Sequence, residues 1–309
     1  MNCDYLYLNK NSLYLKMKRI LFVNTWLHFK NNISLRSYKN IELTEIEKID
    51  MLDNYDLSKF DCVYSPGQPI DVNKYPNTLF IFGPHFSVFP QLNQMNLIRG
   101  QNSVYIQPSD WASKTWENSN LCFNIKQVAL PFGVDTERFK NICSIDKRDR
   151  VFIYYKYRDP KLLNAIESIL SRSSINYNIF SYNTKYDETT YIEYLKHSKY
   201  GIWLGCHESQ GFALEEALSC DVPLIVWNVR SMNEEYRSNY QNIPATSIPY
   251  WDERCGEVFY NLEEFASKMP VFLSKLSAYK PREYVVQNLS MEICEQKLIN
   301  LINESPSSS

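Results

Sequence analysis

The chain has 309 residues, a length typical of two domains, and 44% of them are hydrophobic, which is enough for a core in each domain. It carries 33 Lys and Arg against 35 Asp and Glu, and this formal charge of -2 gives no electrostatic reason to expect a nucleic acid or a membrane surface as partner. No apolar run approaches the ~18 residues of a transmembrane helix, and the first residues are too polar for a signal peptide. Eight cysteines without a C-x-x-C pair indicate reduced thiols, so we expect a cytoplasmic protein.

The first half of the chain alternates short apolar runs with helical stretches. Residues 1–16 come before the first clear strand, which starts after Met17, and are predicted to form an N-terminal extension. After them, β-branched and aromatic runs predict strands at 20–24, 62–64, 78–82 and 103–106, and a helix is expected at 111–118. Short continuous apolar runs of this kind are typical of parallel strands buried on both faces. We therefore expect residues 17–140 to form a first α/β domain.

A linker and a second domain follow. Pro131 and Gly133 interrupt residues 128–139, which predicts a turn or linker rather than a regular element. Strand-like runs then recur at 151–155, 177–181, 200–204 and 222–227, with helical stretches at 160–172, 187–198 and 211–220 between them. This alternation predicts an open parallel sheet that binds ligands at the carboxyl ends of its strands. The predicted second domain spans 141–285, followed by a helix at 286–302 and a disordered tail at 303–309.

The most informative segment is 204–227, LGCHESQGFALEEALSCDVPLIVW. A strand ends, a polar loop holds Glu208 and Gly211, and Glu216 lies inside the next helix. Backbone N–H groups at a helix start bind a diphosphate well, a glycine permits close approach, and carboxylates accept hydrogen bonds from vicinal sugar hydroxyls. Two glutamates at this spacing are also common on solvated helix surfaces. Their position after a buried strand and beside Gly211 favours a binding site.

The same segment resembles the E-x7-E region of the retaining GT-B glycosyltransferases of family 4. Glu208 and Glu216 match the two acids of that region. Ala217 follows the second acid, as in the family, and Pro223 matches a proline. The sequence departs from the pattern in the loop, where the Gly-Phe pair comes two residues late, and at Asp221, where the family commonly has glycine.

A second segment carries the resemblance further. Residues 130–139, LPFGVDTERF, are similar to the interdomain linker of these enzymes. The resemblance implies a GT-B fold, an α/β architecture in which two Rossmann-like domains face a cleft with their parallel sheets. It also implies that the first domain binds the acceptor, that the second binds the nucleotide-sugar donor, and that a final helix crosses back to the first domain.

The resemblance implies roles for the charged residues of the second domain. Glu216 is expected to bind the ribose and Glu208 the transferred sugar. Lys156 and Arg158, which follow a strand, are expected to neutralise the donor diphosphate, with Lys161 as a weaker alternative. The loop completes the predicted donor-binding set with Ser209, Gln210, Gly211 and Phe212.

Histidines add to the predicted site. His85 follows the strand that ends at Phe82, and the resemblance implies that it contacts the donor sugar, so Glu208 and His85 are the predicted catalytic residues. His207 is expected either to contact the donor or to support its loop. The loop after the first strand has Trp26 where family members often have a Gly-rich turn, and we therefore expect a different handling of the acceptor.

The predicted activity is hexosyl transfer with retention, from a nucleotide-diphosphate sugar of the UDP or GDP type to a glycan or another small-molecule hydroxyl acceptor. No cofactor and no metal ion are expected, because the sequence contains no D-x-D and no zinc-spaced cluster of ligands. Phosphate-loop, dinucleotide-binding and hydrolase-elbow motifs are also missing from the sequence. Two alternatives stay open, namely a nucleotide-sugar epimerase of the same fold and a non-catalytic protein that binds a sugar nucleotide or serves as a scaffold.

Overall fold

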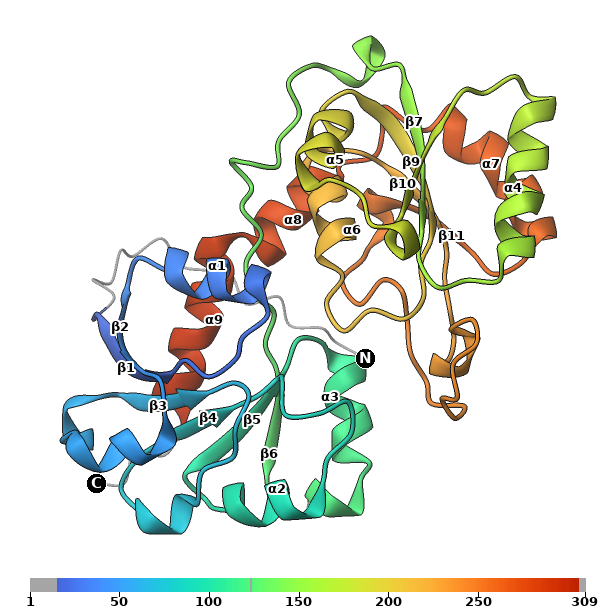
Figure 1. Ribbon diagram of the computed structural model, residues 1–309. Coiled ribbons are helices and arrows are strands. Elements are labelled where there is room, and N and C mark those ends of the chain that lie inside the picture. Colours follow the sequence, from blue (N-terminus) through green and yellow to red (C-terminus); the bar gives the residue numbers. More distant parts are fainter. Residues whose placement is uncertain (1–15, 123, 306–309) are drawn as a thin grey trace, which may run out of the picture.

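The computed structural model describes residues 16–122 and 124–305, which form two α/β domains (Figure 1). Each domain is built on one sheet, and every pair of neighbouring strands in both sheets is parallel. The first sheet has six strands in the order β2-β1-β3-β4-β5-β6, and the second has five in the order β11-β10-β9-β7-β8. In both sheets the order changes direction beside the first strand of the domain, which is where open α/β sheets bind ligands.

The first domain buries both faces of its sheet. Its strands are β1 Lys18–Val23, β2 Ile41–Ile46, β3 Cys62–Ser65, β4 Phe80–Phe82, β5 Ser103–Gln107 and β6 Lys126–Ala129. Its helices are α1 Phe29–Ser37, α2 Leu92–Ile98 and α3 Asp110–Glu117. Because side chains alternate along a strand, Ile20 and Phe22 of β1 enter one core while Leu21 and Val23 enter the other.

The second domain repeats this arrangement. Its strands are β7 Arg150–Tyr155, β8 Asn178–Ser181, β9 Ser198–Leu204, β10 Leu224–Trp227 and β11 Gly256–Phe259. Its helices are α4 Pro160–Arg172, α5 Glu188–Leu195, α6 Phe212–Ser219 and α7 Leu262–Ser274. Phe152 of β7 packs on the side of α5 and α6, whereas Ile153 packs on the side of α4 and α7. The sequence-based prediction of parallel α/β domains is therefore confirmed.

The end of the chain differs from its prediction. Instead of one helix at 286–302, the structure has α8 Pro281–Leu289 and α9 Met291–Glu304, separated at Ser290. The extended backbone of Ser290 ends α8, and its hydroxyl accepts a hydrogen bond from the N–H of Ile293 to cap α9. Residues 303 and 304, which were predicted to belong to a disordered tail at 303–309, are part of α9, and residues 306–309 lie outside the described residues. Almost all of the predicted extension at 1–16 lies outside them as well.

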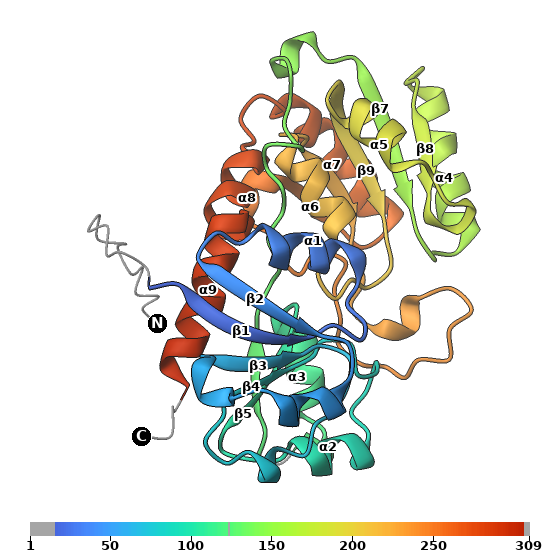
Figure 2. The same ribbon diagram turned by 60° about the vertical axis from the view of Figure 1, so that its left-hand side comes forward.

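The chain crosses between the domains twice. The linker after β6 leads to the second domain, and α8 and α9 lead back, so that α9 covers the first sheet with Cys294, Leu298 and Ile302. Both views show α9 against this sheet (Figures 1 and 2). The two crossings are joined where the N–H of Val134 donates to the carbonyl of Leu289, 2.8 Å away. Among the described helices, none has the length and apolar character needed to traverse a bilayer.

Candidate functional site

A cavity of about 540 Å³ lies between the domains at the carboxyl ends of both sheets. Trp26, His85 and Trp111 line it from the loops or helices that follow β1, β4 and β5, and Lys156 and Glu208 line it from the loops after β7 and β9. A neighbouring cavity has a volume of about 390 Å³. His85, Lys156 and Glu208 line both cavities. The two cavities together form the cleft that the fold predicts at this edge of the sheets.

An ion pair between Glu208 and Lys156 lies in the wall that the two cavities share. Both carboxylate oxygens of Glu208 accept hydrogen bonds from Nζ of Lys156, at 2.8 and 2.9 Å, and the ammonium group lies 4.7 Å from the ring centre of Tyr182. Burial is the largest single influence and lowers the pKa of Lys156, but the charge of Glu208 and its hydrogen bond, together with Cys206 and Tyr182, raise that pKa above its ordinary value. The lysine is therefore charged and its position is fixed at neutral pH.

The loop that carries Glu208 is fixed from both domains. The N–H of Glu208 donates to the carbonyl of Thr246 at 3.0 Å, within the second domain. Its carbonyl accepts a hydrogen bond of 2.8 Å from Nε1 of Trp111, which belongs to α3 in the first domain. Tyr250 also reaches across, donating from its hydroxyl to the carbonyl of Pro108 at 2.6 Å. The position of the Glu208 carboxylate thus depends on the first domain as well as the second.

His85 faces these groups from the first domain. Its Nε2 accepts a hydrogen bond of 3.4 Å from the backbone N–H of His28, and Nδ2 of Asn31 lies 3.3 Å from the same atom. Burial lowers the pKa of His85 to about 4, so the ring is neutral at pH 7. Because Nε2 is the acceptor, Nδ1 carries the hydrogen. Trp26 packs edge-on against the ring with 4.4 Å between centroids and fixes its orientation.

The loop between Glu208 and α6 has a left-handed turn at Gly211, with φ +92°. Glycine adopts this conformation without strain. Within the described residues, no side chain caps α6, and its first residues Phe212 and Ala213 line the 390 Å³ cavity together with Ser209. Backbone N–H groups at the start of a helix attract anions, so this wall of the cavity suits a phosphate group.

Gln210 is occupied by the chain itself. Its amide accepts from the N–H of Phe132 at 3.0 Å and donates to the carbonyl of the same residue at 2.7 Å. The amide also donates to Glu215 at 3.0 Å, and burial raises the pKa of this fully buried carboxyl well above its ordinary value. Gln210 was predicted to bind the donor; in the structure it lines the 390 Å³ cavity, and its amide ties the α6 loop to the interdomain linker.

Glu216 lies in a different place from Glu208. It lines a pocket of only about 30 Å³, and its carboxylate is paired with Lys30 of α1 in the first domain. Lys30 also pairs with Glu188 at 2.8 Å. Burial raises the pKa of Glu216 to about 7, against the opposing effect of the Lys30 charge. The predicted ribose ligand is thus engaged in a contact between the domains.

The predicted basic residues also separate. Lys156 lies in the cleft, whereas Arg158 is only 3% exposed and lines neither cavity. The Arg158 guanidinium donates to the carbonyl of Gly205 at 3.4 Å and lies 3.7 Å from Glu234. Lys161 is exposed on the first turn of α4 and lines neither cavity. The structure therefore brings together Glu208, Lys156, His85 and Ser209, with Gln210, Gly211 and Phe212 in the adjoining wall.

Sequence reasoning missed several residues that line the cleft. Lys30 lines the 390 Å³ cavity, Trp111 lines the larger one, and Tyr182 lines both. Each follows a strand of a parallel sheet, as Glu208 and Lys156 do. Ligands bind at the carboxyl ends of such strands, and this rule applies to every strand of the sheet. It could therefore have predicted all three residues, even though none of them belongs to a recognised motif.

Comparison with known proteins supports the fold. The chain matches no family model and no curated protein sequence. It is similar to the solved N-terminal domain of trehalose-6-phosphate phosphatase from Candida albicans, with a TM-score of 0.54 and 11% identity over 94% of this chain and 97% of that one. Two other solved structures align with TM-scores of 0.46, namely sucrose-phosphate synthase from Thermosynechococcus elongatus (10% identity, 80% of this chain and 74% of that one) and the glycosyltransferase WaaG (11% identity, 93% and 100%). The similarity to the trehalose-6-phosphate phosphatase domain, together with the two facing parallel sheets, defines the chain as a protein of the GT-B fold.

Proposed function

We propose that the protein is a glycosyltransferase that binds a nucleotide-diphosphate sugar in the cleft between its domains. The observation that carries this proposal is the Glu208–Lys156 ion pair, which lies in the shared wall of two cavities, close to the open start of α6. A cation and a row of backbone N–H groups suit a diphosphate, and a carboxylate beside them suits the hydroxyls of the attached sugar.

In the proposed mechanism, Lys156 stabilises the negative charge that develops on the leaving diphosphate. Glu208 accepts hydrogen bonds from the transferred hexose, and neutral His85 donates from Nδ1 to a sugar oxygen. For transfer with retention, we propose front-side attack by the acceptor hydroxyl, whose proton passes to the leaving phosphate. No protein side chain is then needed as general base, which agrees with the weak basicity of His85, whose pKa is lowered to about 4, and with the paired state of Glu208.

The acceptor is proposed to enter the larger cavity. Aromatic rings line much of it, among them Trp26, Phe89, Trp111 and Tyr240. Flat apolar rings pack well against the C–H faces of sugars, while their polar atoms find partners at the edges. The composition of this wall favours a glycan or another sugar-like molecule with a free hydroxyl group.

The first test is binding. We expect the melting temperature of the protein to rise with either UDP or GDP, because a ligand that binds only the native state stabilises it by mass action. Glu208→Gln should leave binding of the free nucleoside diphosphate within about threefold, since Lys156 stays in place, and should lower the rate of donor hydrolysis by about 100-fold. The matched control is Glu263→Gln, which changes an exposed glutamate on α7. If neither nucleotide shifts the melting temperature, the proposal fails.

A binding protein without catalytic activity is the second candidate. The burial of Arg158 favours it, because one of the two cations that were expected to neutralise the diphosphate is absent from the cavity lining. Hydrolysis of a donor sugar separates the two candidates. A protein that binds the nucleotide but releases no sugar above the rate of Glu208→Gln would be a binding protein.

A further inference from the structure

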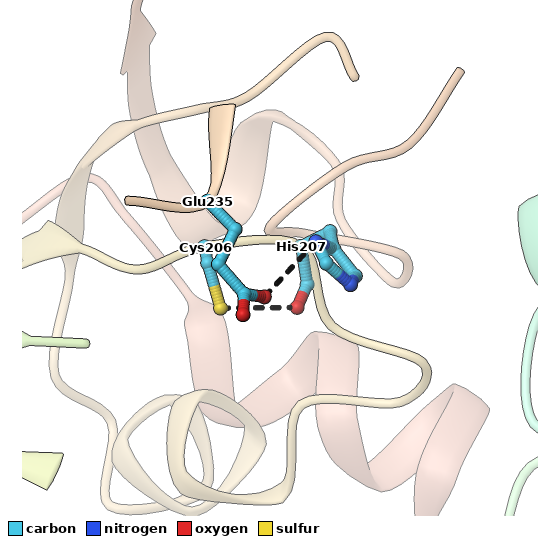
Figure 3. Close-up of side chains that lie close together, drawn as sticks. All are labelled: Cys206, His207 and Glu235. Carbon is cyan, nitrogen blue, oxygen red and sulfur yellow. Dashed lines mark hydrogen bonds and ion pairs between the residues drawn. The ribbon is translucent and has the colours of Figure 1, made fainter. Parts of the chain in front are cut away.

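Three side chains capable of binding a metal ion meet in the wall of the 540 Å³ cavity, apart from the Glu208–Lys156 pair. Cys206 and His207 follow β9, and Glu235 follows the short helical turn Met232–Glu234. Their potential ligand atoms all lie within 4.8 Å of one another. Figure 3 shows the carboxylate of Glu235 directed toward both the sulfur of Cys206 and the ring of His207.

One nitrogen of the His207 ring is left without a hydrogen bond by the described residues around it. Nδ1 is buried and has no hydrogen-bond partner among the described residues. Its nearest carboxylate oxygen, Oε2 of Glu235, is 3.6 Å away, which is beyond hydrogen-bond distance. In a tetrahedral zinc site, two ligands of the nitrogen and oxygen type stand about 3.4 Å apart, so the observed spacing is close to that of two ligands of one ion.

The surroundings hold the ring in this position. Trp111 and Tyr240 pack edge-on against His207, with 5.8 and 5.3 Å between centroids. Cys206 is buried, and its sulfur lies 3.4 Å from the carbonyl of His207. Rigid neighbours of this kind reduce the rearrangement that a ligand set must undergo to bind a metal ion.

The charges also fit a divalent cation. A thiolate and a carboxylate together carry two negative charges, which balance the charge of one divalent ion. The nearby cation, Lys156, is already compensated by both oxygens of Glu208. Sulfur, imidazole and carboxylate form a ligand set that suits zinc, whereas magnesium and calcium prefer sites made of oxygen alone.

We propose that Cys206, His207 and Glu235 bind one Zn²⁺ ion in the cavity wall, with Nδ1 as the ligand atom of His207. Three protein ligands leave at least one coordination position for water or for an oxygen atom of a molecule in the cavity. Linear spacing did not predict this site, because Glu235 comes from a separate loop. The site does not depend on the proposed glycosyl transfer.

Cobalt(II) is the probe for the test, because it replaces zinc in such sites and its bond to a thiolate gives a charge-transfer band in the near ultraviolet. The full chain is freed of metal with a chelator and titrated with Co²⁺ and then with Zn²⁺. We expect one Co²⁺ per chain, a thiolate band, and loss of that band when Zn²⁺ displaces it.

Variants assign the ligands. Cys206→Ser should abolish the thiolate band, and Glu235→Gln should weaken Co²⁺ binding by about tenfold or more while keeping the band. Cys143→Ser, which changes a cysteine outside the cluster, is the matched control and should bind as the unmodified protein does. Circular dichroism confirms folding, and Glu235→Gln keeps the test valid if the buried Cys206 does not tolerate serine. A missing band in the unmodified protein, or an unchanged affinity in Glu235→Gln, would overturn the proposal and leave an ordinary contact between a histidine and a glutamate.

Discussion

Glu208 and Glu216 belong to one short segment but lie in two contrasting regions. Glu208 faces the large cavities and is paired with Lys156 of its own domain. Glu216 faces a small pocket and is paired with Lys30 of the other domain. Phe212 lies between them and lines a cavity on each side. The same pair of acids thus supplies one carboxylate that faces the cleft and one that is paired across the boundary between the domains.

The contrast shows that the spacing of Glu208 and Glu216 in the sequence specifies where each lies relative to α6, but not which residue each one contacts. Glu208 comes before α6, where the chain opens into the cleft, whereas Glu216 is more than one turn inside it. Its side chain is only 4% exposed, so its carboxylate needs either a cation or a proton. If Glu216 is to contact the ribose of a donor, we propose that the domains first move apart enough to release Lys30.

The largest expected effect is that of Lys156→Met on ligand binding. The change removes the cation that we propose for the diphosphate and leaves the Glu208 carboxylate to repel it. We expect the affinity for the nucleoside diphosphate to fall by about 100-fold or more, as measured by titration calorimetry. Lys147→Met, which changes an exposed lysine in the short helical turn Ile145–Lys147 before β7, is the control and should leave the affinity unchanged. An equal loss in both variants would contradict the proposed role.

The next effect concerns Glu216 and its dependence on pH. The folded-state pKa is about 7 and the ordinary value 4.5, so the folded protein binds the proton more tightly than the unfolded one. Stability linked to this group is complete below pH 4.5 and is lost as the pH rises toward 7. Glu216→Gln removes the titration, and we expect it to raise the free energy of unfolding at pH 8 by at most about 3 kcal/mol, with little change at pH 4. Urea unfolding at the two pH values measures the difference.

Lys30→Met should act in the opposite direction. It leaves the buried Glu216 without its cation, so we expect a loss of about 2 kcal/mol in the free energy of unfolding at pH 8. The loss should shrink at pH 5, because the carboxyl can then take up a proton instead. The double variant Lys30→Met with Glu216→Gln should be about as stable at pH 8 as Glu216→Gln alone, because no buried carboxylate is then left without its cation. Independent, additive effects of the two changes would show that the contact does not couple the domains.

The smallest effect should come from Trp111→Phe. Phenylalanine keeps the aromatic wall of the cavity but removes the hydrogen bond to the carbonyl of Glu208. One hydrogen bond of this kind contributes about 1 kcal/mol, so we expect donor affinity to fall by about fivefold. Trp116→Phe changes another tryptophan of α3 and is the control for the helix itself, since its Nε1 bonds to Val88 within the first domain.

The fold could be predicted from the sequence because buried parallel strands leave a strong signal. The run 151–155 is apolar on both faces, and β7 occupies Arg150–Tyr155. Part of the site was also accessible, since Glu208 and Lys156 follow neighbouring strands and must meet at one edge of the sheet.

The features that could not be predicted depend on the three-dimensional course of the chain. Arg158 comes only two residues after Lys156, but Tyr157 between them has a left-handed backbone with φ +49°, and the arginine is buried instead. The partner of Glu216 lies in the other domain, and no local pattern describes how two domains approach each other. The break at Ser290 had a signal in the capping preference of serine, which the prediction of one helix at 286–302 did not take into account.

The return of α9 to the first sheet has a consequence for synthesis on the ribosome. The second domain draws its cores from residues 134–289, so its parts are all available before α9 has been made. The first domain, although its strands are translated first, keeps one face of its sheet uncovered until Leu298 and Ile302 emerge. Domains generally fold as units during translation. This protein must therefore complete its earliest domain last, and a released chain that ends before residue 291 would have a folded second domain beside an unfinished first one.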